Sequence, residues 1–228
     1  MTIASLSPLD LAALLCSRVC HDVISPVGAI VNGLEVLEAE DDEEMRKIAM
    51  DLIKKSALSA SARLQFCRLA FGASGSRGAS IDTSDAENVV RGLLDNDRTS
   101  LKWSGEARLA PKNLVKLVLN LCLVAASAVP RGGIIAVDLG AAGGPSAVRV
   151  EARGAGARLP HGAADLFSGR AVETIDGHSI QPYYTTLLAA ECGMMLEVLL
   201  APESVTLVAG PLAPADPESG QGPAAVES

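Results

Sequence analysis

The spacing of apolar residues predicts a long helix at the start of the chain. Ser7 and Pro8 suit the N-cap and the first position of this helix, which is expected to continue to about Glu38. Its apolar positions recur every three or four residues, and this pattern predicts one buried stripe along the helix. The stripe comprises Cys16, Val19, Val23, Pro26, Ile30 and Leu37.

A second helix is expected to begin in the acidic segment Asp41 to Glu44, because negative charge is favourable at the N-terminal end of a helix. It should end at Gly72. Two such helices form a hairpin that leaves half of each apolar face uncovered, and a second copy is the natural cover. We therefore expect a homodimeric four-helix bundle. The apolar stripe of the second helix comprises Met45, Ile48, Leu52, Ser56, Ala60, Leu64, Cys67 and Phe71.

Beyond the hairpin the sequence changes character. The segment Gly72 to Ser80 contains three glycines and three serines, which is typical of a linker. Helical and strand patterns alternate after it, and they favour a second domain of the α+β class. We expect helices over 85–95, 111–129 and 180–192, strands over 101–103, 134–139, 147–151, 195–200 and 205–208, and a looser segment over 159–167.

These patterns divide the chain into four parts. Residues 1–72 form the helical hairpin, 73–82 the linker and 83–210 the α+β domain. Residues 211–228 are rich in proline, glycine and acidic residues and have little to bury, so we expect a disordered tail.

Composition and charge exclude several classes of function. The net charge is −8, and the six aromatic residues are scattered, so we expect no nucleic-acid partner. The start of the chain has no basic flank before an apolar stretch, and we expect no signal peptide and no membrane span. The odd number of cysteines, with Cys16, Cys20 and Cys67 inside helical patterns, indicates reduced core residues. We expect a soluble, cytoplasmic protein.

His21 is the one histidine of three that lies inside a long predicted helix. It stands two residues from Val19 and from Val23, about 200° around the helix from the buried stripe, so it should point to water. A lone exposed histidine on a helix usually has no chemical role. The face that carries His21, however, is a track of small and polar residues interrupted mainly by Ile24. It comprises Ser17, Arg18, Ser25, Gly28 and Asn32.

One alternative is a haem-attachment or metal motif built from Cys16, Cys20 and His21. The two cysteines lie four residues apart on the predicted buried stripe, and His21 points elsewhere. No export signal leads to a compartment where haem is attached to thiols. We therefore set this reading aside.

The segment His21 to Pro26, which reads His-Asp-Val-Ile-Ser-Pro, resembles the phosphoacceptor box of dimerising histidine kinases. The resemblance implies that His21 is the nucleophile. An exposed imidazole is partly neutral at cellular pH, so one ring nitrogen has a free lone pair to attack phosphorus. Asp22 could accept the other ring proton or stabilise the imidazolium, and Arg18 could hold phosphoryl oxygens.

The second domain resembles the ATPase domain of histidine kinases, with Asn120 on the expected helix. In that family a second asparagine four residues later ligates magnesium, but this chain has Val124 there. The aspartate that reads adenine is replaced by Ala152, and the segment before the last helix has one glycine, Gly177, where phosphate binding needs several. The resemblance therefore implies an α/β sandwich whose nucleotide site is degenerate.

The chain combines an intact phosphoacceptor box with a degenerate nucleotide site. In this combination it resembles the ChpT-type histidine phosphotransferases of the alphaproteobacterial cell-cycle phosphorelay, over residues 8 to about 209. The segment Gln181 to Tyr184 also carries this resemblance. It implies a relay of phosphoryl groups from the receiver domain of a hybrid histidine kinase to aspartates of response regulators. It implies no cofactor and no metal in this chain, with magnesium on the receiver domain.

Two alternatives remain open at this point. An active sensor-kinase core would bind ATP, and a non-catalytic pseudokinase scaffold would not use His21 as a nucleophile. If the relay function holds, Ile24 and Gly28 should help to form the docking surface for receiver domains, because an exposed apolar residue beside a small one can anchor a partner helix. The other residues expected to contact the partner are Ser17, Ser25 and Asn32.

Overall fold

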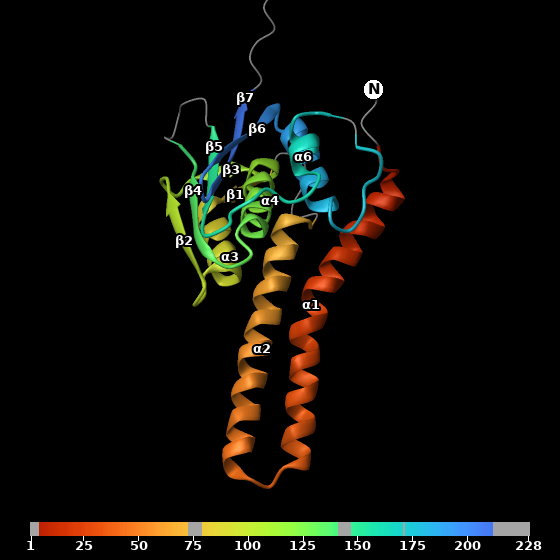
Figure 1. The fold of residues 1–228 in the computed structure, drawn as a ribbon, viewed down its shortest axis with the longest axis vertical. Coiled ribbons are helices and arrows are strands. Elements are labelled where there is room, and N and C mark those ends of the chain that lie inside the picture. Colours follow the sequence, from red (N-terminus) through yellow and green to blue (C-terminus); the bar gives the residue numbers. More distant parts are fainter. Residues whose placement is uncertain (1–4, 73–78, 141–146, 171, 212–228) are drawn as a thin grey trace, which may run out of the picture.

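The computed structural model describes residues 5–72, 79–140, 147–170 and 172–211. Two long antiparallel helices, α1 (Pro8–Ala39) and α2 (Glu43–Ala70), extend from a compact second part (Figure 1). Ser7 caps α1 by accepting a hydrogen bond from the backbone N–H of Asp10, and Asp42 caps α2 in the same way. The predicted hairpin is confirmed.

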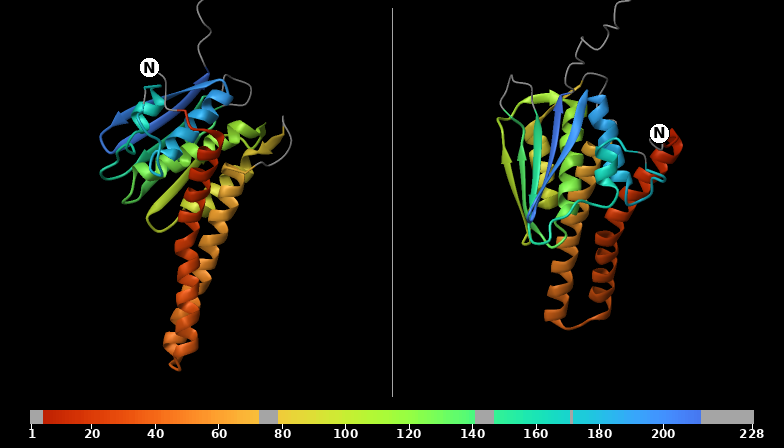
Figure 2. Two further views of the ribbon diagram at one scale, coloured as in Figure 1. Left: turned by 90° about the vertical axis from the view of Figure 1, so that its right-hand side faces the viewer. Right: turned by 45° about the horizontal axis from the view of Figure 1, so that its top comes forward.

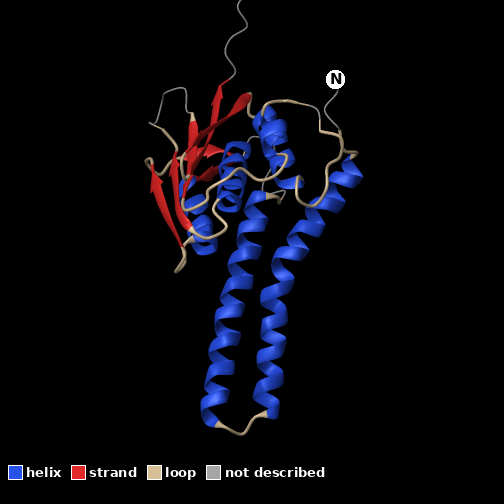
Figure 3. Ribbon diagram, viewed as in Figure 1, coloured by secondary structure: helices blue, strands red, loops and turns tan. Residues whose placement is uncertain are grey.

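The second part is an open sheet with helices on one face, as Figures 2 and 3 show. The strand order is β2-β4-β5-β7-β6, with β2 parallel to β4 and the other neighbours antiparallel, while β1 and β3 form a separate antiparallel pair. This architecture confirms the α+β class. The elements are β1 (Ser80–Asp82), α3 (Thr83–Leu94), β2 (Thr99–Ser104), β3 (Leu109–Pro111), α4 (Lys112–Ala128), β4 (Gly133–Asp138), β5 (Val148–Arg153), α5 (Ala163–Phe167), α6 (Ile180–Glu191), β6 (Met194–Ala201) and β7 (Ser204–Pro211).

Helix α4 lies at the centre of the main core. Most of its residues are apolar and buried, and it contacts α2, α3, α6 and the sheet. The core also takes in Phe66 and Ala70 at the end of α2. The C-terminal end of the hairpin is therefore part of the core of the second domain.

The N-terminal end of the hairpin is attached as well. A second, smaller core joins the first turns of α1 to α5 and α6, and the backbone N–H of Leu6 donates a hydrogen bond of 3.2 Å to the hydroxyl of Tyr183. Both helices of the hairpin are thus held at the end near the second domain. The α1 side of this core comprises Leu6, Leu11, Leu14 and Leu15, and its α5 and α6 side includes Leu166, Ile180, Tyr183 and Leu187.

The interface between α1 and α2 differs from the predicted stripes. Small residues, Gly33 of α1 with Ala49 and Ala60 of α2, are buried there. A Cβ at Gly33 would lie 2.6 Å from Cγ1 of Ile53, so glycine permits the close approach. The predicted stripes combine positions that face the partner helix with positions turned away from it. The predicted stripe residues that are exposed are Cys16, Met45, Ile48, Leu52 and Leu64.

Cys16 and Cys20 are both exposed free thiols, so the prediction that they are core residues is wrong for the single chain. Cys67 is half-buried. The reason is that Cys16 and Cys20 lie on the side of α1 that α2 does not cover. Helical periodicity locates an apolar side chain on a face but does not say whether that face is covered within one chain.

Some boundaries also differ from expectation. Strands β1 and β3, three residues each, were not predicted, because such short strands show no alternation. β1 occupies Ser80–Asp82, inside the predicted linker 73–82, and Pro211 belongs to β7 instead of the tail. Residues 73–78 and the tail from residue 212 lie outside the described residues. The division into domains stays a prediction.

Helix α1 is long and apolar enough, by length and composition, to cross a membrane. The expectation of no membrane span stays a prediction. In the fold α1 packs along α2, and it carries an ion pair between Arg18 and Asp22, which is a costly feature for a helix that faces lipid.

Candidate functional site

His21 projects from α1 with 85% of its side chain exposed. The prediction that it points to water is confirmed. Ser17, Ser25 and Asn32 are exposed on the same track. Gly28 opens onto free space, because a Cβ placed there would meet no atom within 4 Å. Ile24, at the edge of the track, is 70% exposed.

Asp22 connects His21 to Arg18. Its Oδ1 lies 3.2 Å from Nδ1 of His21, and its Oδ2 accepts a hydrogen bond of 2.9 Å from Nε of Arg18. A carboxylate only accepts hydrogen bonds, so we assign the ring proton of His21 to Nδ1. Nε2 then carries the free lone pair and is the nitrogen available to an incoming phosphorus atom.

Arg18 and Asp22 also border a groove of about 310 Å³ between the hairpin and the second domain. Burial is the main cause that raises the pKa of the Cys67 thiol in this groove, and the nearby Asp22 carboxylate raises it further, while Arg18 and Arg63 lower it. The groove therefore reaches the acid that contacts His21. Its other lining residues are Phe66 and Phe71 at and just after the end of α2, Leu93, Leu94 and Asn96 at and just after the end of α3, and Leu123, Ala126 and Ser127 of α4.

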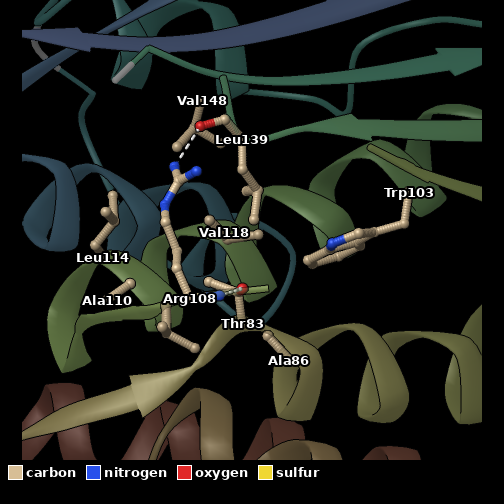
Figure 4. A pocket seen from close by; sticks show the side chains of 10 residues that line it. Thr83, Ala86, Trp103, Arg108, Ala110, Leu114, Val118, Leu139 and Val148 are labelled. Carbon is tan, nitrogen blue, oxygen red and sulfur yellow. Dashed lines mark hydrogen bonds between the residues drawn. The ribbon is translucent and has the colours of Figure 1, made fainter. Parts of the chain in front are cut away.

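A second pocket, shown in Figure 4, lies among α3, β3, α4 and the end of β4, and none of its lining residues belongs to the hairpin. Its volume is only about 10 Å³, too small for more than one water molecule. The Arg108 guanidinium beside it donates hydrogen bonds to the carbonyl oxygens of Leu139, at 2.6 Å, and Gly140, at 3.1 Å. The pocket is therefore a packing feature. The hydrogen bonds of Arg108 connect the start of β3 to the segment that follows β4.

The positions that correspond to a kinase nucleotide site are filled by packing. Val124 and Ala152 are fully buried in the main core. Asn120 is also fully buried, and its Nδ2 donates to the backbone carbonyls of Lys116, at 2.7 Å, and Ala70, at 3.3 Å. Its Oδ1 accepts a hydrogen bond of 2.6 Å from Nε2 of Gln181. The amide of Asn120 is thus used to join α2, α4 and α6.

Metal ligands are sparse in this arrangement. Within residues 5–72, 79–140, 147–170 and 172–211, no group of three or more His, Cys, Asp or Glu side chains is placed to hold a metal ion. Asp22, the carboxylate nearest to the exposed ring of His21, already contacts Arg18 and His21.

Comparison with known proteins decides the family. The family model described as the histidine phosphotransferase C-terminal domain matches residues 83–204. Protein phosphotransferase ChpT of Brucella abortus (strain 2308) is 50% identical over 206 residues, which cover 90% of this chain and 97% of that protein. The chain belongs to the histidine phosphotransferase family. The resemblance to ChpT-type proteins is thereby confirmed.

One solved structure agrees with this assignment to the histidine phosphotransferases. A structure described as a bacterial phosphotransferase has 47% identity and a TM-score of 0.83, and the match covers 92% of this chain and all of that one. A more distant match is a histidine kinase domain from Erythrobacter litoralis EL346, with 12% identity, coverage of 82% of this chain and 94% of that chain, and a TM-score of 0.44.

Sequence reasoning on this histidine phosphotransferase missed several α2 residues near the site. Arg63 borders the groove beside Asp22, and Ile48 and Leu52 continue its row along α2 at helical spacing, both exposed. The spacing of apolar residues assigns Ile48 and Leu52 to the buried stripe of the second helix. Their exposure on the same side as Arg63 is visible only once α1 and α2 are packed together.

Proposed function

We propose that this histidine phosphotransferase relays phosphoryl groups between receiver domains through a phosphohistidine at His21. The observation that carries the proposal is the exposed imidazole with Asp22 against Nδ1, which directs the nucleophilic Nε2 toward solvent. The donor is the receiver domain of a hybrid histidine kinase, and the acceptors are aspartates on response-regulator receiver domains. The family assignment supports phosphoryl transfer as the chemistry.

In the accepting step, the lone pair on Nε2 of His21 attacks the phosphorus of an aspartyl phosphate on the donor. The N–P bond forms as the bond between phosphorus and the carboxylate oxygen breaks, and the donor aspartate leaves as a carboxylate. The ring then carries positive charge, which the Asp22 carboxylate offsets at Nδ1. In the second step an acceptor aspartate attacks the same phosphorus, and Nε2 of His21 is the leaving group.

We further propose that the chain needs neither ATP nor a metal of its own. Val124 and Ala152 bring apolar side chains where nucleotide binding needs a carboxamide and a carboxylate, and Asn120 is held by three internal hydrogen bonds. Magnesium would belong to the acidic pocket of the docked receiver domain. Equilibrium dialysis with millimolar ATP tests this point, and binding would favour the alternative of an active sensor-kinase core.

The hairpin supports a homodimeric four-helix bundle. Val27, Val31 and Leu34 recur at helical spacing along α1, and each is close to half exposed. Met50 and Leu64 are the exposed apolar residues of α2 on the same side, which is the side away from the groove of Arg18 and Arg63. A contiguous apolar surface of this kind is typical of an interface, and a second hairpin with the same pattern fits it.

The opposite side of the hairpin suits receiver docking. It combines the polar track around His21 with Ile48 and Leu52, two exposed apolar residues of α2. Ile24 is also exposed and borders the track at its other edge, three residues before Val27, so it lies between the track and the proposed dimer side. Gly28 leaves space for close approach of a partner helix. Ser17, Ser25 and Asn32 offer hydrogen-bonding groups around this contact. With receivers as partners, we place the protein in the cytoplasm.

The decisive experiment is incubation of the chain with a radiolabelled phosphorylated receiver domain. We expect acid-labile label on the wild-type chain, none on His21→Ala, and wild-type labelling on His161→Ala, whose histidine is also exposed but lies in the second domain. His21→Ala should remain dimeric and folded, because an exposed side chain contributes little to stability. Label that still passes from receiver to regulator through His21→Ala would favour the scaffold alternative and overturn the proposal.

A further inference from the structure

Arg18 stands one helical turn before Asp22, and the two side chains form an ion pair that is mostly shielded from water. The Nε to Oδ2 distance is 2.9 Å, and the side chains are 25% and 22% exposed, against 85% for His21. Arg63 and Cys67 lie in the same groove. The pair is therefore a fixed part of the groove wall, whereas the imidazole beside it projects into solvent.

The geometry of a helix explains why Asp22 needs such an anchor. Adjacent side chains diverge by about 100°, so a carboxylate does not face the ring of the preceding residue by default. Asp22 reaches Nδ1 of His21 with Oδ1 while Oδ2 is held by Arg18. Each carboxylate oxygen of Asp22 therefore contacts a different side chain, Oδ1 that of His21 and Oδ2 that of Arg18. A guanidinium Nε–H donates in a fixed direction within the plane of the group, which restricts the rotamer of its acceptor.

We propose that Arg18 is a positioning residue for phosphoryl transfer: it fixes Asp22 in the rotamer that keeps the ring proton of His21 on Nδ1, so that Nε2 stays available as the nucleophile. The inference rests on the proposed function of His21. It differs from the role expected from the sequence, in which Arg18 would hold phosphoryl oxygens directly. The observed partner of Nε is Asp22.

The two roles predict different results in a double-mutant cycle. If Arg18 acts through Asp22, then Arg18→Ala slows transfer in the wild-type background and has no further effect in Asp22→Ala. If Arg18 binds the phosphoryl group, the two losses multiply. We expect Arg18→Ala to slow loss of label from a phosphorylated receiver by roughly tenfold, less than the hundredfold or more typical of a lost acid or base, because Arg18 acts through Asp22.

The second readout is the tautomer of His21, measured by ¹⁵N NMR on protein with ¹⁵N-labelled histidine. His161 and His178 serve as internal references, since they lie outside the hairpin. We expect the wild-type ring of His21 to carry its neutral-state proton mainly on Nδ1, and Arg18→Ala to shift the population toward Nε2–H. Arg18→Lys should be intermediate, because an ammonium keeps the charge but loses the planar Nε–H. Arg149→Ala, an exposed arginine on the open face of the sheet, is the matched control and should change neither readout.

The outcomes separate this inference from the proposed function. Transfer through His21→Ala would remove the proposed function. If His21→Ala abolishes transfer but Arg18→Ala leaves the rate and the tautomer unchanged, or if the losses of Arg18→Ala and Asp22→Ala multiply, the positioning role is wrong. Circular dichroism and sedimentation on each variant establish that it is folded, and Arg18→Lys provides the same comparison with the charge retained.

Discussion

Asn120 and Gln181 join α4 to α6 through one hydrogen bond between their side-chain amides, with Nε2 of Gln181 2.6 Å from Oδ1 of Asn120. The amide orientation is fixed, because Nδ2 of Asn120 donates to two backbone carbonyls and only its oxygen can accept. Gln181 has one buried oxygen, Oε1, without a hydrogen bond among the described residues. Asn120 matches the asparagine of the kinase ATPase domain in position, but here its side chain hydrogen-bonds one helix to another.

Asn120→Ala should therefore lower the stability of the fold without a direct effect on chemistry at His21. It removes the hydrogen bonds to Ala70, Lys116 and Gln181 and leaves buried partners unsatisfied, which costs about 1–3 kcal/mol. Urea denaturation measures this loss. Asn113→Ala, on the first turn of the same helix, should cost much less. Equal losses in the two variants would argue that the buried amide network contributes nothing particular.

The homodimer is tested on α1. Val31 is 48% exposed in the single chain and lies on the side proposed to face a second hairpin. Val31→Glu should shift the protein to monomer, since a carboxylate buried in an apolar interface is unfavourable. Sedimentation velocity measures the change. Leu58→Glu is the matched control: Leu58 is 72% exposed on α2 near α3, outside the proposed interface, so this variant should stay dimeric. A dimer that survives Val31→Glu would place the interface elsewhere.

A stability change with pH is expected at the N-cap of α3. Asp82 accepts hydrogen bonds from the backbone N–H and the hydroxyl of Ser84. Both bonds lower the pKa of its carboxyl below the usual value, and the backbone bond has the larger effect. A folded-state pKa below the unfolded value gives stability that is present above the unfolded pKa and is lost as pH falls through the folded pKa. Asp82→Ala should thus be less stable than wild type at neutral pH, and urea midpoints should converge in acid. A constant difference across this range would contradict the cap.

Sequence patterns predicted the hairpin and the exposure of His21 because both depend on positions within one helix. His21 lies 200° from the apolar stripe, and no tertiary contact changes that angle. The Arg18 to Asp22 spacing of four residues was also visible in the sequence as a pair signal. Sequence alone assigns Arg18 and Asp22 separate roles, because the groove that shields the pair is formed by residues of α2, α3 and α4.

Other features depend on contacts between distant segments. Asn120 and Gln181 are 61 residues apart, and nothing local to either indicates the bond between them. The spacing on α2 predicts one buried face, but Ala60 is buried whereas Ile48 and Leu64 are exposed on different sides of the helix. Three-residue strands such as β1 are set by their partners, since their sequences carry no period.

Ile24 provides the test of receiver docking. It is 70% exposed beside His21, and an exposed isoleucine next to open space at Gly28 is suited to anchor an apolar side chain of a partner helix. Ile24→Glu should weaken receiver binding by roughly tenfold, the loss typical of an interface residue worth more than 1 kcal/mol, and should raise the receiver concentration needed for half-maximal transfer. Leu109→Glu, equally exposed on β3, should leave both unchanged. Ile24 stands three and seven residues before Val27 and Val31, at the border of the proposed dimer side, and its high exposure predicts that Ile24→Glu stays a dimer. Sedimentation velocity on the same variant checks this, and a loss of transfer supports docking only in a variant that is dimeric. Unaltered transfer kinetics in Ile24→Glu would show that the receiver approaches His21 without using this side chain.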